Sequence, residues 1–205
     1  MTGRVIAIDG PVGSGKSTIA RALGDHLGVA VLETGAMYRA VAAAALRRGI
    51  DPGPETSDEL VELARGVTID AGHRVLVHGE DVTADLRSGA VNRAVSAVAS
   101  DADVRAEMVE RQRAWAEAHG GGVVEGRDIG TVVFPDAHLK VFLTASEQER
   151  ARRRNSDEDA ADLARRDELD STRSASPLKS APDAVVIDST GLTVEEVVQE
   201  IVSHL

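Results

Sequence analysis

The sequence predicts an α/β fold in which helices flank a mostly parallel β-sheet. Apolar runs typical of buried strands alternate with segments of helical spacing along almost the whole chain. The first such run, "RVIAID" at residues 4–9, leads through a glycine-rich loop into a helical pattern. A helix between successive strands is the connection that allows those strands to lie parallel in one sheet.

The first 66 residues are expected to form two strands and three helices. Ile19, Leu23 and Leu27 recur at helical spacing after the glycine-rich loop, and Gly49 ends a long alanine-rich segment. The expected elements are a strand at 4–9, helix at 16–28, strand at 29–33, helix at 35–49, loop at 50–57 and helix at 58–66.

The pattern changes at residues 67–83, where apolar and polar residues alternate around "AGH" and "GED". This alternation predicts a small antiparallel hairpin or three-stranded insert. The elements expected after it are a helical region at 88–118, buried strands at 121–126 and 139–145, a charged and largely helical stretch at 146–173, a strand at 184–188 and a helix at 193–205.

The composition limits the class of protein. The 205 residues contain no cysteine and carry a net charge of −11. Disulfides and thiolate metal sites are therefore excluded, and a general nucleic-acid binder is disfavoured. Apolar runs stay well below the roughly 20 residues of a membrane helix, and the N-terminus lacks a signal-peptide pattern. We expect a cytoplasmic protein without nucleic-acid or membrane partners, in which any metal has oxygen ligands.

Residues 10–17, "GPVGSGKS", fit the phosphate-loop pattern G-x-x-x-x-G-K-[ST] and lie between a predicted strand and a predicted helix. Glycines let successive backbone N–H groups converge on phosphates, and the helix N-terminus adds its positive dipole. Lys16 is expected to reach the β- and γ-phosphates, and the Ser17 hydroxyl to ligate Mg²⁺. The residues expected to bind the donor are Gly10, Pro11, Val12, Gly13, Ser14, Gly15, Lys16, Ser17 and Thr18.

The loop does not indicate where the phosphoryl group goes, and two classes of protein remain. A nucleotide switch would transfer it to water, whereas a small kinase would transfer it to a bound acceptor. A GTP-binding switch should show an N-K-x-D motif, and this tetrapeptide does not occur in the sequence. A kinase needs several arginines beyond the loop and a means of excluding water. The candidate arginines are Arg39, Arg105, Arg127, Arg150, Arg152, Arg153, Arg154, Arg165, Arg166 and Arg173.

The densest arginine cluster lies in the charged stretch at 146–173. One interpretation is a mobile lid whose guanidinium groups close over the transferring phosphoryl group. The alternative is a solvated helix face on which the arginines pair with nearby acidic residues. Under the first interpretation, the catalytic residues are Lys16, Arg127, Arg150, Arg153 and Arg154.

Four ordered segments then resemble a known family: "IDGPVGSGKST", "ETGAMYR", "EGRDIGTVVFPDA" and the terminal "RD…D…R…SPL…A…VIDST". Over nearly its whole length the chain resembles bacterial cytidylate kinases, which phosphorylate CMP and dCMP with ATP and Mg²⁺. The resemblance implies a monomeric P-loop kinase with three parts. These are a P-loop core at 1–33, 101–148 and 170–205, a nucleoside monophosphate-binding domain at 34–100 with the antiparallel insert near 67–83, and a short lid at 149–169.

The resemblance also implies roles for individual residues. A carboxylate that accepts from cytosine N4 and a guanidinium that donates to N3 and O2 would select CMP over UMP. The residues implied at CMP are Thr34, Arg39 and Arg127 at the monophosphate, Ser96, Arg105 and Asp128 at the base, Asp170 and Arg173 at the ribose, and Arg166 across the phosphates.

Several of these positions have a structural alternative. Asp128 could cap a turn, and Ser96 could be a helix serine bonded to its own backbone. Asp9 and Glu125 could orient the water shell of Mg²⁺ or could equally be caps. Glu33 stands where the family usually has Asp, which could shift a contact near Thr34. Other acceptors also remain as alternatives, namely UMP, dTMP, shikimate and dephospho-coenzyme A.

Overall fold

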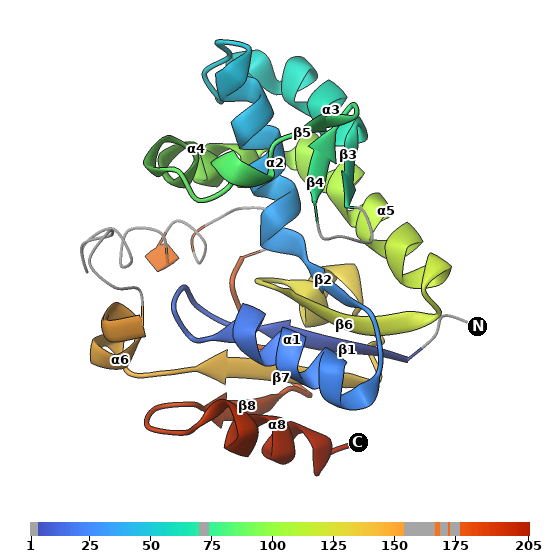
Figure 1. The fold of residues 1–205 in the computed structure, drawn as a ribbon, viewed down its shortest axis with the longest axis vertical. Helices are drawn as coiled ribbons and strands as arrows, with labels where there is room; N and C mark the ends of the chain where they lie inside the picture. The colour runs from blue at the N-terminus through green and yellow to red at the C-terminus, as the bar shows by residue number, and fades with distance from the viewer. Residues whose placement is uncertain (1–3, 70–73, 154–166, 169–171, 173–176) are drawn as a thin grey trace. The chain divides into compact units, whose positions relative to one another are not determined.

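The computed structural model describes residues 4–69, 74–153, 167–168, 172 and 177–205. The chain forms two compact units, which we call unit 1 (Met1–Glu33 and Arg113–Leu205) and unit 2 (Thr34–Gln112) (Figure 1). Among the helices of the described residues, none has both the length and the apolar character needed to cross a membrane.

Unit 1 contains a five-stranded sheet in the order β2-β6-β1-β7-β8, in which every neighbouring pair of strands is parallel. The carboxyl ends of these strands therefore meet at one edge of the sheet, which is the edge where α/β proteins bind ligands. The strands are β1 (Arg4–Asp9), β2 (Val31–Glu33), β6 (Gly121–Gly126), β7 (Leu139–Thr144) and β8 (Val185–Asp188).

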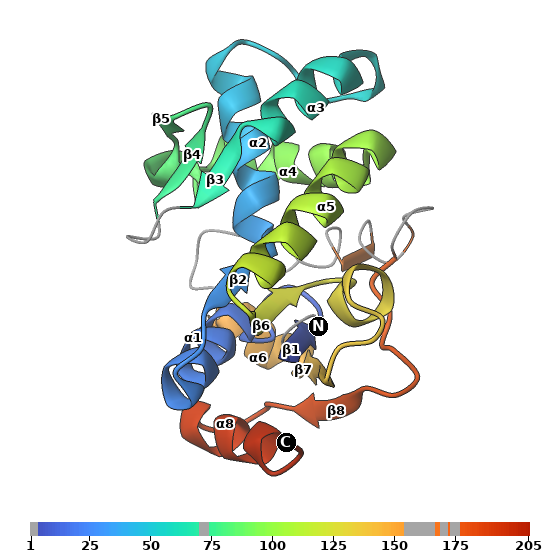
Figure 2. The ribbon, with the colours of Figure 1, turned by 90° about the vertical axis from the view of Figure 1, so that its right-hand side faces the viewer.

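One apolar cluster joins this sheet to two helices, α1 (Lys16–Leu27) and α8 (Val194–Val202), which lie side by side (Figure 2). The helices contribute Leu23 and Ile201, both fully buried, and the sheet contributes Ile8 and Leu143. The strands are apolar on successive residues because a parallel sheet is covered on both faces. The sheet edge that follows β1 is thus held on a rigid core.

The remaining elements of unit 1 lie around the strand ends. Helix α6 (Glu147–Arg153) follows β7, and a π-helical turn, η3 (Ile129–Val133), follows β6 and contacts both β1 and β6. The C-terminal part of α5 (Ala102–Ala118) leads into β6, and Arg113 on it donates to the carbonyl oxygens of Val133 and Val132 at 3.0 and 3.1 Å.

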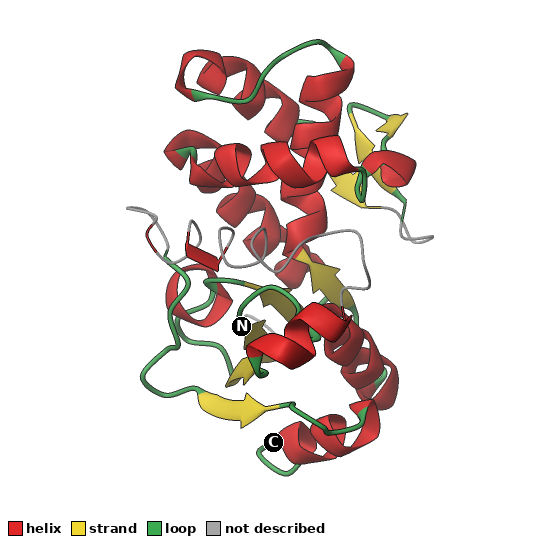
Figure 3. Ribbon diagram, turned by 90° about the vertical axis from the view of Figure 1, so that its left-hand side faces the viewer, coloured by secondary structure: helices red, strands yellow, loops and turns green. Residues whose placement is uncertain are grey.

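Unit 2 combines helices with a separate antiparallel sheet in the order β3-β4-β5 (Figure 3). Helix α2 packs against α3, α4 and this sheet, so its alanine-rich sequence lies at the centre of the unit. The elements are α2 (Thr34–Arg47), η1 (Pro54–Thr56), α3 (Ser57–Arg65), β3 (Val67–Ile69), β4 (Val75–Val77), β5 (Glu80–Asp81), η2 (Thr83–Asp85), α4 (Gly89–Ser100) and the first part of α5.

The observed architecture confirms the predicted parallel sheet with flanking helices and the small antiparallel insert. Two local features differ from the expectation. The helical region at 88–118 is two helices, because Asp101 is extended and its Oδ1 accepts from the backbone N–H groups of Asp103 and Val104 at 3.0 and 2.9 Å. The π-helical turn η3 lies within the segment "EGRDIGTVVFPDA", where no element is expected between the strands at 121–126 and 139–145.

Candidate functional site

The phosphate loop connects β1 to α1 as the motif requires. Gly10 has φ 150°, and a Cβ placed there would lie 2.0 Å from the Leu143 carbonyl oxygen, so only glycine fits against β7. Gly15 has φ 95° and directly precedes Lys16, the first residue of α1. The loop therefore brings its backbone N–H groups and the positive end of α1 to the same place.

Lys16 is buried, and its Nζ donates to the Pro11 carbonyl oxygen at 2.8 Å. The pKa of Lys16 is lowered from its ordinary 10.5 to about 7, mainly by burial and also by the neighbouring positive charge of Arg127, against the opposing charges of Glu125 and Asp9. The bound phosphates of a nucleotide would supply the negative charge that this position lacks. The site is thus adapted to a polyanionic ligand.

Ser17 and Glu125 form the oxygen-rich part of this site. The Ser17 hydroxyl donates to Glu125 Oε1 at 3.1 Å, which joins the start of α1 to the end of β6 across 108 residues. A hydroxyl beside a buried carboxylate is a donor set that suits Mg²⁺, which prefers oxygen ligands and retains several waters. The residues present therefore fit the ion that phosphoryl transfer from a nucleoside triphosphate needs.

Arg127 and Asp128 immediately follow β6 at the same sheet edge. Arg127 Nη1 donates to the Gly10 carbonyl oxygen at 3.1 Å, so this arginine lies against the first residue of the phosphate loop. Asp128 is buried, and its backbone carbonyl accepts from Val132 N at 2.8 Å as η3 begins. Arg127 thus contacts the phosphate loop and Asp128 begins η3, whereas the binding of CMP by these two residues stays a prediction.

Two arginines of α6 contact backbone carbonyl groups of the phosphate loop. Arg150 Nη1 donates to the Val12 carbonyl oxygen at 3.0 Å and also pairs with Asp167. Asp167 in turn accepts from the Val12 N–H at 2.8 Å, so one carboxylate bridges the loop and Arg150. The sequence reasoning did not select Asp167, although it belongs to the terminal "RD…D…R" pattern.

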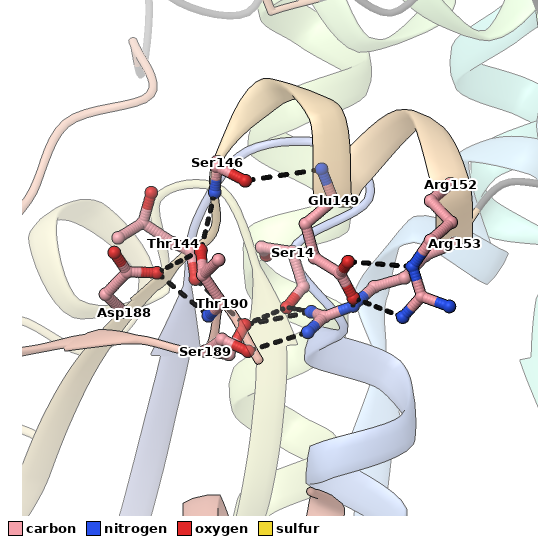
Figure 4. A network of polar contacts seen from close by, with 9 residues as sticks. All are labelled: Ser14, Thr144, Ser146, Glu149, Arg152, Arg153, Asp188, Ser189 and Thr190. Atoms are coloured by element: carbon pink, nitrogen blue, oxygen red, sulfur yellow. Dashed lines mark hydrogen bonds and ion pairs between the residues drawn. The ribbon is translucent and has the colours of Figure 1, made fainter. Parts of the chain in front are cut away.

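Arg153 contacts both the loop and the segment after β8 (Figure 4). Its Nη1 donates to the Ser14 carbonyl oxygen at 3.0 Å and to Ser189 Oγ at 2.9 Å, and its Nη2 donates to the Ser189 carbonyl oxygen at 2.7 Å. Glu149 accepts from Arg153 Nε at 2.8 Å and also pairs with Arg152. The α6 arginines therefore fall into two groups. Arg150 and Arg153 contact the loop. Arg152 has an exposed side chain and, among the described residues, pairs only within α6.

Unit 2 holds the predicted residues of the "ETGAMYR" segment. Thr34 is buried at the start of α2, and Arg39 is half-buried one turn later. Arg39 Nη1 donates to the Leu86 carbonyl oxygen at 3.0 Å and to Asn92 Oδ1 at 2.5 Å. These contacts fix the Arg39 guanidinium between α2 and α4. Asn92 is a further residue that the sequence reasoning did not select.

Arg105 is buried on α5 with 4% of its surface exposed. Its guanidinium carbon lies 5.5 Å from the centroid of the Tyr38 ring, and its Nη1 donates to the Ala99 carbonyl oxygen at 3.1 Å. A desolvated guanidinium over an aromatic face gains cation–π stabilisation. Ser96 is half-buried on α4. Thr34, Arg39, Ser96 and Arg105 thus belong to one unit, and Arg127 and Asp128 to the other.

The structure accounts for the unusual Glu33 at the end of β2. Its Oε1 accepts from Arg21 Nε on α1 at 2.5 Å, an ion pair within unit 1. The extra methylene relative to Asp lengthens the reach of the carboxylate, which here contacts α1. Four predicted site residues lie outside the described residues, as does most of the predicted lid at 149–169: Arg154, Arg166, Asp170 and Arg173.

Comparison with known proteins assigns the chain to a family. The family model described as cytidylate kinase matches residues 6–205. The chain is 47% identical to a cytidylate kinase of Pelotomaculum thermopropionicum over 98% of its own length and 95% of that protein. It is 49% identical to a cytidylate kinase of Geobacillus kaustophilus over 96% of its length and 93% of that protein.

Solved structures agree at the level of the fold. A Thermus thermophilus protein, TT1252, superimposes with a TM-score of 0.51 at 19% identity, over 100% of this chain and 99% of that one. The family match covers both the phosphate loop and the "EGRDIG" segment whose contacts are described above. The chain belongs to the cytidylate kinase family.

Proposed function

We propose that the chain transfers the γ-phosphoryl group of ATP to CMP or dCMP and releases ADP with CDP or dCDP. The observation that carries this proposal is the family match over residues 6–205, which includes an intact phosphate loop. A phosphate oxygen of the acceptor forms a bond to the γ-phosphorus, and the bond from that phosphorus to the β–γ bridging oxygen breaks. ADP leaves with the electron pair, so the step is a group transfer without oxidation or reduction.

The donor side is built from the phosphate loop and Lys16. Backbone N–H groups of the loop and the N-terminus of α1 would hold the phosphates, and the Lys16 ammonium would neutralise charge on the β- and γ-phosphates. Arg150 and Arg153 contact loop carbonyl groups, which supports a role in orienting the loop or in reaching the phosphates. When bound, Mg²⁺ would supply positive charge that offsets the charge developing on the phosphates. Ser17 would hold it, with Glu125 alongside.

The acceptor side of the proposal rests on the residues that the family resemblance implies. Thr34, Arg39 and Arg127 would bind the monophosphate, because arginine forks match the spacing of phosphate oxygens. Asp128 would accept from cytosine N4, and Arg105 with Ser96 would donate to the acceptor atoms of the base. Roles for Arg166, Asp170 and Arg173 at the phosphates and ribose, and for Arg154 in transfer, belong to the same proposal.

No proton needs to be removed from the acceptor, because a CMP phosphate oxygen is already anionic at neutral pH. The residues would therefore act by positioning the two nucleotides in line and by neutralising charge. The net charge of −11 supports small nucleotides as the ligands, held at local clusters of arginine, rather than a nucleic-acid backbone. We further propose that the enzyme works as a cytoplasmic monomer.

The proposal is tested by following both products in one reaction. With ATP, Mg²⁺ and CMP, chromatography should show CDP and ADP formed in equal amounts, and omission of CMP should stop almost all ADP formation. A nucleotide-hydrolysing switch would instead release ADP and inorganic phosphate without CMP. That second pattern would contradict the proposal.

A further inference from the structure

The Asp9 side chain at the end of β1 is buried and bonded to a distant backbone segment. Its exposed fraction is 5%. Oδ1 accepts from the Ile129 N–H at 2.8 Å, and Oδ2 accepts from the Gly130 N–H at 2.7 Å. Both N–H groups belong to the first residues of η3, which directly follows Arg127 and Asp128. One carboxylate thus caps the segment that carries two predicted CMP-binding residues.

A second contact, from a side chain to a backbone carbonyl group, joins the same two segments. Arg127 donates from Nη1 to the carbonyl oxygen of Gly10, the residue after Asp9. Arg127 itself contacts Gly10, and the two residues after Asp128 contact Asp9. The segment that carries Arg127 and Asp128 is therefore held at the end of β1. Because β1 and β6 are neighbouring parallel strands with Asp9 opposite Gly126, these contacts span adjacent strand ends.

The fit around the carboxylate is tight. A Cβ added at Gly130 would lie 3.4 Å from Asp9 Oδ2 and 3.2 Å from the aliphatic carbons Cγ and Cδ of Lys140. The residue at position 130 must therefore be small for its N–H group to approach Asp9 at 2.7 Å. A carboxylate at 9 and a small residue at 130 thus suit each other.

Burial makes an ionised carboxyl group at this position unfavourable. Desolvation raises the pKa of Asp9 from its ordinary 3.8 to about 6, although the two backbone hydrogen bonds and Lys16 act in the opposite direction. The neighbouring Asp128 raises it further. A buried carboxyl group with a raised pKa is a poor way to stabilise a fold. Its presence here therefore favours a functional role for Asp9.

We propose that Asp9 is a positioning residue that sets the orientation of Arg127 and Asp128 toward the acceptor nucleotide, and so controls the discrimination between CMP and UMP without touching either nucleotide. The inference rests on the proposed function, in particular on base reading by Asp128. Both Asp9 oxygens accept from backbone N–H groups of this segment, so the residue would act through the segment 127–130.

The first test is Asp9→Asn, which keeps the shape of the side chain but replaces one acceptor oxygen with an N–H donor facing an N–H group. We expect KM for CMP to rise, and the CMP:UMP ratio of kcat/KM to fall, by about tenfold each, since small displacements of a reading group cost this much. KM for ATP and the Mg²⁺ concentration for half-maximal rate should change by less than about twofold.

The second test, Gly130→Ala, perturbs the same contact from the other side with Asp9 intact. The added methyl group would press on the Lys140 side chain at 3.2 Å, and the resulting shift of residue 130 should lower the CMP:UMP ratio in the same direction. Because φ of Gly130 lies outside the left-handed region, alanine is tolerated by the backbone, so this variant tests the inference even if Asp9→Asn does not fold.

The matched control is Glu196→Gln on α8. Glu196 is also a carboxylate that caps a helix start, since its Oε2 accepts from the Thr193 N–H at 2.8 Å. Its loss should lower thermal stability and leave the CMP:UMP ratio unchanged. A wild-type ratio in both test variants, or an altered Mg²⁺ dependence without a change in the ratio, would overturn the inference. A wild-type enzyme without CMP preference would instead overturn the proposed function.

Discussion

Lys16 is the residue whose charge depends most directly on the ligand. Its ammonium group is buried, and its nearest hydrogen-bond acceptor is the Pro11 carbonyl oxygen. Burial and the charge of Arg127 lower the pKa of Lys16 to about 7. Phosphate oxygens at the loop would favour the charged form, so nucleotide binding should raise this pKa again.

We therefore predict that ATP binding takes up a proton at pH 8. Above its pKa of about 7 the free Lys16 is mostly neutral, whereas beside the phosphates it should be charged. Calorimetric titration with ATP and Mg²⁺ in buffers of different ionisation enthalpy would measure an uptake approaching one proton. At pH 6, where Lys16 is already charged, the uptake should disappear. A binding enthalpy independent of the buffer at pH 8 would contradict this explanation.

Asp128 provides the test of base reading. In Asp128→Asn, an amide N–H group can donate to the uracil carbonyl at C4, which the carboxylate would repel. We predict that the CMP:UMP ratio of kcat/KM falls by about tenfold or more, since loss of a specific hydrogen-bonding partner typically has this size.

The control for Asp128→Asn is Asp136→Asn, the same substitution at an exposed position eight residues later. It should leave the ratio unchanged, so steady-state kinetics with both acceptors on both variants separates base reading from a general loss of charge. An Asp128→Asn enzyme with the wild-type ratio would remove Asp128 from base reading.

Single residues could be predicted from the sequence where the information is local. The phosphate-loop pattern identifies Lys16 and Ser17 because the loop and helix are contiguous. The partners of such residues could not be predicted in the same way. Glu125 meets Ser17 only because β6 lies beside β1, and the contacts of Asp9 with η3 have the same origin. Family resemblance, rather than spacing, selected Arg105 from the other arginines of its helix.

Helix α6 contacts the phosphate loop through two arginine side chains, those of Arg150 and Arg153. Ser189, buried after β8, lies at the centre of these contacts (Figure 4). Its hydroxyl accepts from Arg153 Nη1 at 2.9 Å and donates to the Thr144 carbonyl oxygen at 2.9 Å. Thr190 Oγ1 accepts from the Ser146 N–H at 2.8 Å, so the residues just before α6 are held as well.

Ser189→Ala should loosen α6 from the loop. Removal of a buried hydroxyl that leaves its partners unsatisfied costs about 1–3 kcal/mol, and we expect a loss of that size in the free energy of unfolding. KM for ATP should rise several-fold because Arg153 would lose one of its anchors. Thermal denaturation and ATP kinetics measure the two effects.

The corresponding control is Ser203→Ala at the end of α8, where the exposed hydroxyl donates only to the Glu200 carbonyl oxygen among its hydrogen bonds to described residues. The expected change there is within about 0.5 kcal/mol. Equal effects of the two substitutions would contradict the role given to Ser189.

Helices and strands were predictable where periodicity is strong. The run at residues 4–9 and the alternation at 67–83 specified β1 and the antiparallel sheet. The break between α4 and α5 was missed because Asp101 looks like any polar residue within a helical pattern, although it is an N-cap. The π-helical turn η3 has no periodic signature, since it depends on the long-range contacts of Asp9.

At the level of the whole molecule, the Asp9 carboxyl group links folding stability to pH. Its folded pKa of about 6 exceeds the ordinary value of 3.8, so the folded state binds the proton more tightly. The contribution of this group to stability is therefore largest at low pH and is lost as the pH rises from about 4 to 6.

The stability of Asp9→Asn relative to that of wild type should thus rise by on the order of 2–3 kcal/mol as the pH increases from 4 to 7, whatever the constant cost of replacing one acceptor oxygen. Denaturant unfolding of both proteins, followed by the fluorescence of Trp115, the only tryptophan, would measure this difference. Other titrating groups affect both proteins and cancel in the comparison. A difference that does not vary with pH would show that Asp9 is not shifted as described.

The class of fold followed from the alternation of strands and helices, but the strand order β2-β6-β1-β7-β8 did not. The order depends on which apolar faces pack together, and apolar runs such as those of β6 and β7 look alike in sequence. The phosphate loop alone likewise does not identify the acceptor nucleotide. The prediction of CMP as the acceptor came from four ordered motifs that resemble a family. The family match over residues 6–205 confirmed that resemblance.

The central claim is therefore the identity of the acceptor. A coupled assay with ATP tests it by measuring kcat/KM for each acceptor in a panel. The panel is CMP, dCMP, UMP, AMP, GMP, dTMP, shikimate and dephospho-coenzyme A. We predict that kcat/KM for CMP or dCMP exceeds that for every other acceptor by about tenfold or more, a margin that one specific hydrogen-bonding contact can supply. A preference for any acceptor outside the cytidine pair would contradict the proposed function.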